Sequence, residues 1–465
     1  MRIIGKVGGA GRSFASDRRG NFAIATAAVS AVLLLAIGYG VNTAQLYHVK
    51  TNLRSAMDAA VTSTARDLTT GRISEKDAPG IVDAFLQANG NFGFASQETL
   101  TLDRVVIDRT AKTVTADAHV DVALLFPLFA DQNNTRIALE TAAVYSDKQI
   151  EVAMMLDITG SMAKKGKKDK IGDLQAAARN AVDLLLDGQD KDNPRVRVAI
   201  VPYAEAVNTG KLSGAVFAEQ KGGSDLPPPN AAAKPAAFTS AADHCATERK
   251  LPGGAADFSD DGPFTERFDK KGNVYFAKVN RDDRLDVCPK AELVALTANK
   301  QKLLDTIDDF RANGVTAGGI AAQWGYYMLS PQWRSAVKDA GMGDGPAKFD
   351  PRKVAKVAIL MTDGQFNTAF AGVKDGDTPQ NRQGEKSRSY AESLCANMRH
   401  DGIDIYTIGF DLGAGEKDEA RGVLKNCASP DSGDIRHFFD VSTGAELDAA
   451  FKEIIRNTER LALTK

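Results

Sequence analysis

From residue 149 onward, short apolar runs alternate with segments in which apolar residues recur every three or four positions. The short runs predict buried strands at residues 149–156, 196–203, 354–364, 402–410 and 437–442. The longer segments predict helices at residues 171–186, 302–310, 318–329, 387–400 and 444–457. Strands that alternate with helices favour a mostly parallel, Rossmann-like sheet with helices on both faces, and such sheets bind ligands beyond the carboxyl ends of their strands.

The N-terminal region has a different pattern. Phe22 to Val41 contains no charged residue and has about the length that a helix needs to cross a bilayer. Apolar residues then continue at helical spacing to about residue 70, which predicts an amphipathic stalk, at Leu46, Val49, Leu53, Met57, Val61 and Leu68. A cleaved secretory signal and a buried core helix are the alternatives to a membrane span.

Charge around the apolar segment predicts its orientation. Five basic residues precede it against the single acid Asp17, namely Arg2, Lys6, Arg12, Arg18 and Arg19. A basic flank stays on the cytoplasmic side, so we expect a cytoplasmic N-terminus and an extracytoplasmic chain after about residue 45.

These patterns predict four regions along the chain. They are a basic tail (1–20), a transmembrane helix (21–45) that continues as a stalk to about 70, a small α+β spacer (71–146) and an α/β domain (147–465) with an insertion at about 204–292. The spacer shows a hairpin pattern around Asp108–Thr113. The insertion holds a Pro, Ala and Gly-rich stretch (221–240), a hairpin pattern at Lys271–Gly272, and acids at 257–262 that we expect to be solvated.

Composition narrows the function classes. The chain has 465 residues, of which 43% are hydrophobic, and a formal net charge of −2, so nothing in its overall charge favours binding to nucleic acid. All four cysteines follow the apolar segment, and an even number outside the cytoplasm predicts two disulfides. Proximity in sequence favours Cys245 with Cys288 and Cys395 with Cys427, whereas four buried thiols are the alternative.

Oxygen-bearing side chains gather at predicted strand ends. Asp157, Thr159 and Ser161 follow the first strand, Asp363 lies at the end of the third, and Thr316 precedes a helix. Carboxylates and hydroxyls without Cys or His are hard ligands, which suit Mg²⁺, or Mn²⁺ or Ca²⁺, better than zinc. Taken singly, Asp157 and Thr316 could be capping residues and Asp363 a turn residue.

Residues 18 to about 68 resemble a known family. The stretch RRGNFAIATAAVSAVLLLAIGYGVNTAQLYHVKTNLRSAMDAAVTSTARDL is similar to the N-terminal segment of TadE/TadG-like proteins of bacterial tight-adherence (Flp) pilus assembly. Pilin-type precursors are cut after a glycine and carry a glutamate five residues later, but here Ala25 stands at that position after Gly20. The resemblance therefore implies a retained single-pass anchor in the bacterial inner membrane.

Residues 149 to about 460 resemble a second family. The order Asp157-Ile158-Thr159-Gly160-Ser161, then Thr316, then Asp363, is similar to the metal-ion-dependent adhesion site (MIDAS) of von Willebrand factor A domains. The resemblance implies that Thr159 and Ser161 bind the metal directly, that Thr316 joins them when ligand binds, and that Asp157 and Asp363 act mainly through water. One position would remain for an acidic side chain of a partner. Thr159 replaces the serine usual at its position.

We therefore expect a membrane-anchored, extracytoplasmic module that binds a protein partner through a divalent cation during pilus assembly or surface adhesion. The first alternative is a structural, minor-pilin-like component. The second is a metal-assisted hydrolase that would use Asp157 and Asp363. We expect no enzymatic activity, because no nucleophile motif is present and none of the histidines lies in one, namely His48, His119, His244, His400 and His437.

Overall fold

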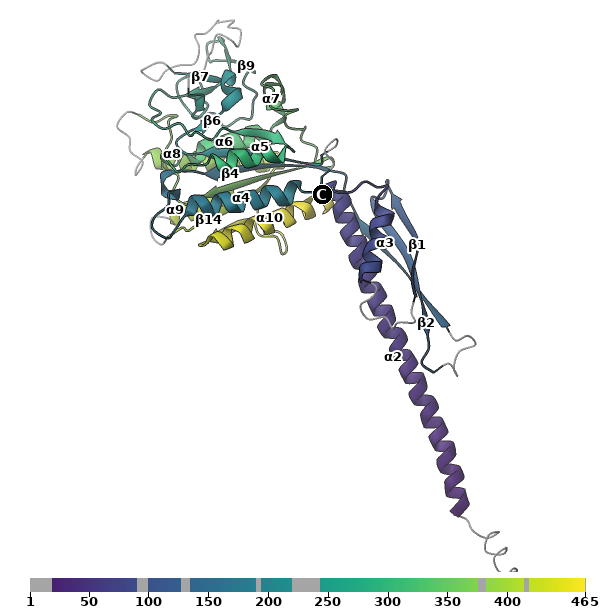
Figure 1. Cartoon of the computed structure of the whole chain (residues 1–465). Coiled ribbons are helices and arrows are strands. Elements are labelled where there is room, and N and C mark those ends of the chain that lie inside the picture. The colour runs from purple at the N-terminus through teal and green to yellow at the C-terminus, as the bar shows by residue number, and fades with distance from the viewer. Residues whose placement is uncertain are drawn as a thin grey trace, which may run out of the picture. The chain divides into compact units, whose positions relative to one another are not determined.

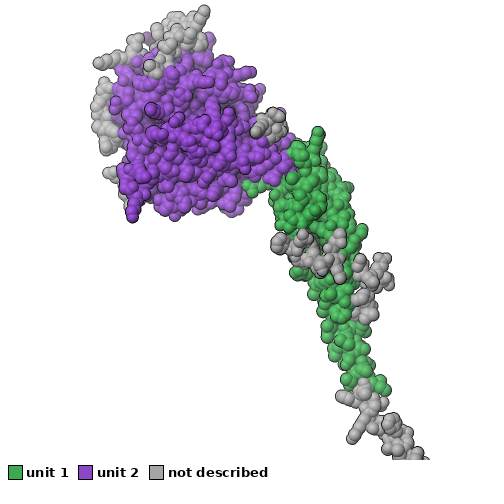
Figure 2. All heavy atoms as spheres, viewed as in Figure 1, with its two compact units in different colours: residues 1–66, 74–145 green, residues 67–73, 146–465 purple. Residues whose placement is uncertain are grey.

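The structure is a computed structural model that describes residues 19–89, 99–126, 134–189, 194–219, 243–374, 382–413 and 418–464. The chain forms two compact units (Figure 2). Unit 1 comprises residues 1–66 and 74–145, and unit 2 comprises residues 67–73 and 146–465. The basic residues at positions 2 to 18 and the Pro, Ala and Gly-rich stretch 221–240 lie outside the described residues.

Unit 1 combines a long helix with a small antiparallel sheet. Its elements are α2 (Arg19–Thr70), whose last residues group with unit 2, α3 (Ala78–Asn89), and the strands β1 (Thr99–Asp108), β2 (Thr113–Ala123) and β3 (Asn134–Val144) in the order β1-β2-β3. Val49, Leu53 and Met57 of the predicted stripe are buried. The Asn42 side chain exchanges two hydrogen bonds of 2.8 and 3.0 Å with the backbone of Phe126. The amphipathic part of α2 therefore belongs to the core of unit 1.

The first part of α2 is apolar and exposed. Ile24 and Leu34 are 71% and 68% exposed, in a helix without charged residues between 22 and 41. Among the described residues, one helical stretch, Ile24–Thr70, is long and apolar enough to cross a membrane by length and composition. Exposed leucine and isoleucine on all sides of a helix are costly in water, so this stretch supports a membrane anchor.

Unit 2 is built on a six-stranded sheet. Its strands are β12 (Val294–Thr297), β5 (Val196–Tyr203), β4 (Gln149–Asp157), β13 (Val354–Thr362), β14 (Asp404–Phe410) and β15 (Phe438–Val441), in that spatial order. All neighbours pair in parallel except β12, which runs antiparallel to β5 at one edge. The predicted mostly parallel sheet is confirmed, and the four-residue edge strand β12 was not predicted.

Helices cover both faces of this sheet (Figure 1). One face packs against α4 (Lys170–Leu186), α5 (Lys300–Asp308) and α10 (Gly444–Thr464), and the other against α6 (Gly318–Leu329), α8 (Arg382–His400) and α9 (Asp418–Cys427). Alternate residues of β4 face the two sides, with Met154 in one core and Met155 in the other. Burial of both faces explains the unbroken apolar run of this strand from Val152 to Leu156.

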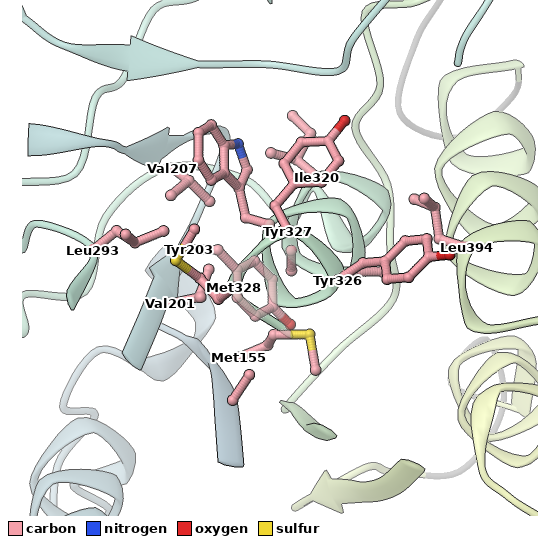
Figure 3. Close-up of a cluster of buried hydrophobic side chains, with 14 of the residues drawn as sticks. Met155, Val201, Tyr203, Val207, Leu293, Ile320, Tyr326, Tyr327, Met328 and Leu394 are labelled. Atoms are coloured by element: carbon pink, nitrogen blue, oxygen red, sulfur yellow. The ribbon is translucent and has the colours of Figure 1, made fainter. Parts of the chain in front are cut away.

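Helix α6 forms the centre of one core. All of its residues are buried, and Figure 3 shows Tyr327 and Met328 of α6 in one cluster with Met155 and Val201 of the sheet. A Cβ on Gly325 would overlap the side chain of Met155. The glycine thus permits the helix to approach the sheet closely.

The insertion lies between β5 and β12 and forms its own small elements. They are β6 (Val207–Asn208), β7 (Val216–Ala218), β8 (Cys245–Ala246), β9 (Glu266–Phe268), β10 (Val274–Phe276) and β11 (Val279–Arg281). The strands β9 and β10 form the hairpin predicted at Lys271–Gly272. Unit 2 also contains helix α7 (Arg334–Asp339) and the short helices η3 (Gly210–Ala215), within the insertion, and η5 (Pro331–Trp333).

Both disulfides have the pairing that sequence proximity favours. Cys245 joins Cys288 within the insertion, and Cys395 of α8 joins Cys427 of α9. The first bridge ties β8 to the segment that returns toward β12. The second ties two neighbouring helices on one face of the sheet.

The acids at 257–262 are not solvated as expected. Asp257 is 7% exposed and pairs with Arg249 at 3.0 Å and with Arg267 at 2.5 Å. Asp261 also pairs with Arg267. The expectation was wrong because the insertion buries the Arg249 guanidinium, and a buried charge requires partners.

Candidate metal centre

Two adjacent parallel strands bring the candidate carboxylates together. Strand β4 ends at Asp157, and its neighbour β13 ends at Thr362, one residue before Asp363. Leu156 pairs with Met361 in the register between them, so both acids emerge at the same edge of the sheet. Asp157 and Asp363 are both fully buried.

The turn after β4 carries the two hydroxyls. The backbone NH of Thr159 donates to Asp157 Oδ1 at 2.9 Å, and this bond shapes the turn before the short helix η2 (Gly160–Met162). Thr159 Oγ1 and Ser161 Oγ are 2.9 Å apart, and Ser161 Oγ donates to Asp363 Oδ1 at 2.5 Å. Hydrogen bonds thus connect four of the five predicted residues, with Asp157 joined through the backbone NH of Thr159.

Thr316 reaches the same region through its loop. The Gly160 NH donates to the Gly314 carbonyl at 2.9 Å, and the Asn313 NH donates to the Ile158 carbonyl at 3.0 Å. The Thr316 NH donates to Asn367 Oδ1 at 2.9 Å, which ties the loop to the segment after Asp363. No side-chain hydrogen bond joins Thr316 to the other four among the described residues.

The electrostatics of the group fit a divalent cation. Burial, together with the negative charge of Asp363, raises the pKa of Asp157 to about 7. Thr362 Oγ1 donates to Asp157 Oδ2 at 2.7 Å, which compensates only part of this cost. Two buried carboxylates beside two hydroxyls are a donor set that a hard cation would neutralise.

Two charged residues at the centre were missed by sequence reasoning. Lys170 Nζ lies 2.8 Å from Asp363 Oδ2 and 3.3 Å from Asp411 Oδ2. Asp411 directly follows β14. Because ligands bind beyond the carboxyl ends of parallel strands, the reasoning that predicted Asp363 could also have predicted Asp411. Lys170 lies in a run of lysines that normally marks a solvated surface, and only its burial, at 14% side-chain exposure, sets it apart.

A second group of carboxylates lies within the insertion. Glu219, Asp282 and Asp283 have oxygens close enough to share one ion. Lys250 Nζ, however, contacts Glu219 Oε1 at 2.7 Å and Asp282 Oδ2 at 2.6 Å. The Arg284 guanidinium also pairs with Asp282 at 2.8 Å. The protein's own cations therefore pair with the two buried members of this group, Glu219 and Asp282.

A comparison with protein families identifies the N-terminal segment. Residues 20–67 match the Tad family, described as "Putative Flp pilus-assembly TadE/G-like". This match confirms the TadE/TadG-like resemblance of residues 18 to about 68. No curated protein matches the sequence.

Solved structures that resemble the chain include proteins of bacterial pili. The pilus adhesin SpaC from Lactobacillus rhamnosus GG has a TM-score of 0.36 and 12% identity, with 79% of this chain and 35% of SpaC covered. The vWF domain of the type V pili tip protein Mfa5 from Porphyromonas gingivalis has a TM-score of 0.36 and 13% identity, with 69% of this chain and 97% of that domain covered. A variant of the PilB minor pilin from Streptococcus sanguinis has a TM-score of 0.37 and 11% identity, with 80% of this chain and 81% of PilB covered. The matched region thus spans about a third of SpaC, and likenesses this weak assign neither fold nor function.

Proposed function

We propose that this chain is a membrane-anchored module of Flp-type pilus assembly or surface adhesion whose unit 2 binds a protein partner through a divalent cation. The observation that carries the proposal is the connected group of Asp157, Thr159, Ser161 and Asp363 at the carboxyl ends of β4 and β13. The TadE/G-like match of residues 20–67 supports the pilus context.

The fold of unit 2 is proposed to be that of a von Willebrand factor A domain. The parallel sheet with one antiparallel edge strand and helices on both faces supports this proposal. In such a domain Thr159 and Ser161 would bind the cation, and Asp157 and Asp363 would supply the neutralising charge. The cation, Mg²⁺ or else Mn²⁺ or Ca²⁺, supplies a positive centre that attracts an acidic side chain of the partner.

The proposed orientation follows from the apolar helix and its basic flank. α2 crosses the bacterial inner membrane once, with the N-terminus in the cytoplasm and unit 2 outside. Two disulfides in unit 2 support an oxidising compartment for that unit.

A structural, minor-pilin-like role is the second candidate, because the exposed apolar part of α2 could also pack into a filament. A hydrolase is a weaker third candidate. Within the described chain, no histidine hydrogen-bonds to the side chains of Asp157, Ser161 or Asp363. A hydrolase would need some other group to activate its nucleophile.

The metal is tested by thermal unfolding of the full chain in detergent, with chelator and then with excess Mg²⁺, Mn²⁺ or Ca²⁺. A ligand at a hundred times its Kd stabilises the native state by about 2.7 kcal/mol, so the midpoint should rise. The rise should vanish in the double variant Asp157→Ala, Ser161→Ala. It should persist in Ser393→Ala, whose hydroxyl donates only within helix α8. No rise with any of the ions, in the wild type or in a Lys170→Met variant, would overturn the metal site.

The partner is tested with purified pilus and surface proteins offered to the immobilised chain. Capture in Mg²⁺ should be lost on chelation and in Ser161→Ala, and should persist in Ser393→Ala. If capture is unaffected by chelation and by Ser161→Ala, the cation takes no part in partner recognition. Appearance of the chain in sheared filaments, with a mature N-terminus at Asn21, would instead favour the minor-pilin role.

A further inference from the structure

A lysine side chain already sits at the candidate metal centre. Lys170 is the first residue of α4, and its ammonium lies 2.8 Å from Asp363 Oδ2. The Lys170 side chain is 14% exposed and the Asp363 side chain is 0% exposed, so little water screens the pair. The other oxygen of Asp363 accepts the hydrogen bond from Ser161. Both carboxylate oxygens are therefore engaged by the protein itself.

Lys170 has a second carboxylate within reach. Its ammonium lies 3.3 Å from Asp411 Oδ2, and Asp411 also pairs with Lys168 at 3.0 Å. Asp411 is held in a left-handed conformation, with φ of 51°, and its NH donates to the Val441 carbonyl at 2.6 Å. The acid is thus fixed by the backbone of β14 and β15, independently of the metal centre.

The charges around Lys170 favour its ammonium form. A lysine side chain is ordinarily charged at neutral pH, and the carboxylates of Asp363 and Asp411 lie 2.8 and 3.3 Å from its ammonium. A permanent positive charge beside Asp363 has two opposite effects. It relieves the repulsion between Asp363 and Asp157 when no divalent ion is bound, and it repels a divalent ion that approaches the same carboxylate.

We infer that Lys170 is a tethered cation that neutralises Asp363 in the metal-free protein and thereby sets the concentration of divalent cation at which the site fills. This inference rests on the proposed metal binding of unit 2. Asp411 is the carboxylate that keeps the ammonium paired when a metal engages Asp363. A similar arrangement occurs in the insertion, where the Lys250 ammonium contacts both Glu219 and Asp282.

The experiment compares four full-length variants with the wild type in detergent. Lys170→Met removes the charge, and Lys170→Gln removes the charge but keeps a hydrogen-bond donor if the first variant does not fold. Asp411→Asn removes the second carboxylate, and asparagine tolerates the left-handed backbone. Lys165→Met removes an exposed charge of the same loop as a matched control. The unfolding midpoint is measured in chelator and along a titration with Mn²⁺ and Mg²⁺.

Lys170→Met and Lys170→Gln should lower the midpoint in chelator and lower the half-saturating Mn²⁺ concentration by about tenfold. Asp411→Asn should raise that concentration, because the metal must then compete for Asp363 with an ammonium that has lost its second carboxylate partner. Lys165→Met should leave the midpoint in chelator unchanged and the half-saturating Mn²⁺ concentration within about twofold of the wild-type value, because its charge is exposed and screened.

The outcomes separate this inference from the proposed function. If the wild type responds to metal and the Lys170 variants respond at the same concentration, the tethered-cation role is overturned and metal binding stands. If only the Lys170 variants respond, the lysine occupies the site at the ion concentrations tested, and the inference is supported. If neither responds, both proposals fail.

Discussion

Ser161 Oγ donates a hydrogen bond of 2.5 Å to Asp363 Oδ1 across 202 residues of sequence. The bond joins the turn after β4 to the turn after β13, which are neighbouring strands of the sheet. Asp363 is fully buried, and the Ser161 hydroxyl and the Lys170 ammonium each contact one of its carboxylate oxygens. Groups of the protein itself therefore hold Asp363 in place at the site.

Ser161→Ala should destabilise the protein even in the presence of chelator. A hydrogen bond to a buried charged group contributes about 1 to 3 kcal/mol, and its loss leaves Asp363 Oδ1 without that donor. Ser393→Ala is the control, because its hydroxyl donates only to the Ser389 carbonyl one turn earlier in α8. Denaturant unfolding in chelator measures both. Equal stability of the two variants would show that the Ser161–Asp363 bond contributes nothing in the metal-free state.

Gly318→Ala should destabilise unit 2 by about 1 to 3 kcal/mol, the usual cost of overpacking a core. A Cβ at Gly318 would overlap the ring of Phe366, which is 2% exposed and lies three residues after Asp363. The change should also weaken metal binding, because the Phe366 segment carries Asn367, which holds the Thr316 loop.

Gly422→Ala in α9 is the matched control for Gly318→Ala. Nothing lies within 4 Å of a Cβ at Gly422, so this change should be neutral or should stabilise the helix by about 0.5 to 1 kcal/mol. Thermal unfolding of both variants gives the comparison. A Gly318→Ala protein as stable as Gly422→Ala would mean that Phe366 has room to move.

The strand and helix pattern was predictable because both faces of the sheet are buried. β4 is apolar from Val152 to Leu156 and β13 from Val357 to Met361, and the rule that ligand sites lie at strand ends then located Asp157 and Asp363 without any coordinates. The amphipathic stripe of α2 was predictable because one side of the helix is buried. Val49 and Leu53 recur at helical spacing on that side and are both buried.

Contacts between distant charged residues could not be predicted in this way. Lys170 and Asp363 are 193 residues apart, and no periodicity distinguishes this lysine from its exposed neighbours. Asp257 was expected to be solvated because its arginine partners are not adjacent in sequence. Pairing of charges depends on which loops the topology brings together, and that information appears only with the fold.

Loss of the Cys395–Cys427 disulfide should destabilise unit 2 by about 2 to 5 kcal/mol. Both cysteines are fully buried, and the bridge closes a loop with a sequence separation of 32 residues between α8 and α9. The double variant Cys395→Ala, Cys427→Ala should therefore unfold at lower denaturant than the wild type. The double variant Cys245→Ala, Cys288→Ala provides the parallel measurement for the insertion. Four free thiols in the non-reduced, denatured wild type would contradict both bridges.

Glu248 should make stability depend on pH near neutrality. It is 3% exposed, its carboxylate accepts the Phe370 NH at 3.1 Å, and burial raises its pKa from 4.5 to about 7. The folded state thus binds the proton more tightly than the unfolded state. The resulting stability is fully present below about pH 4.5 and is lost as the pH rises through about 7.

Glu248→Gln removes this titration and keeps an oxygen that can accept from Phe370. A shift of this size corresponds to about 3 kcal/mol. Relative to Glu248→Gln, the wild type should therefore lose about that much free energy of unfolding between pH 4.5 and about pH 8. Urea unfolding of both proteins in chelator at several pH values measures the difference, and any titration of Asp157 is common to both and cancels. Parallel pH curves for the two proteins would show that Glu248 is ionised in the fold at no extra cost, and that its buried surroundings, including Lys250, compensate its charge fully.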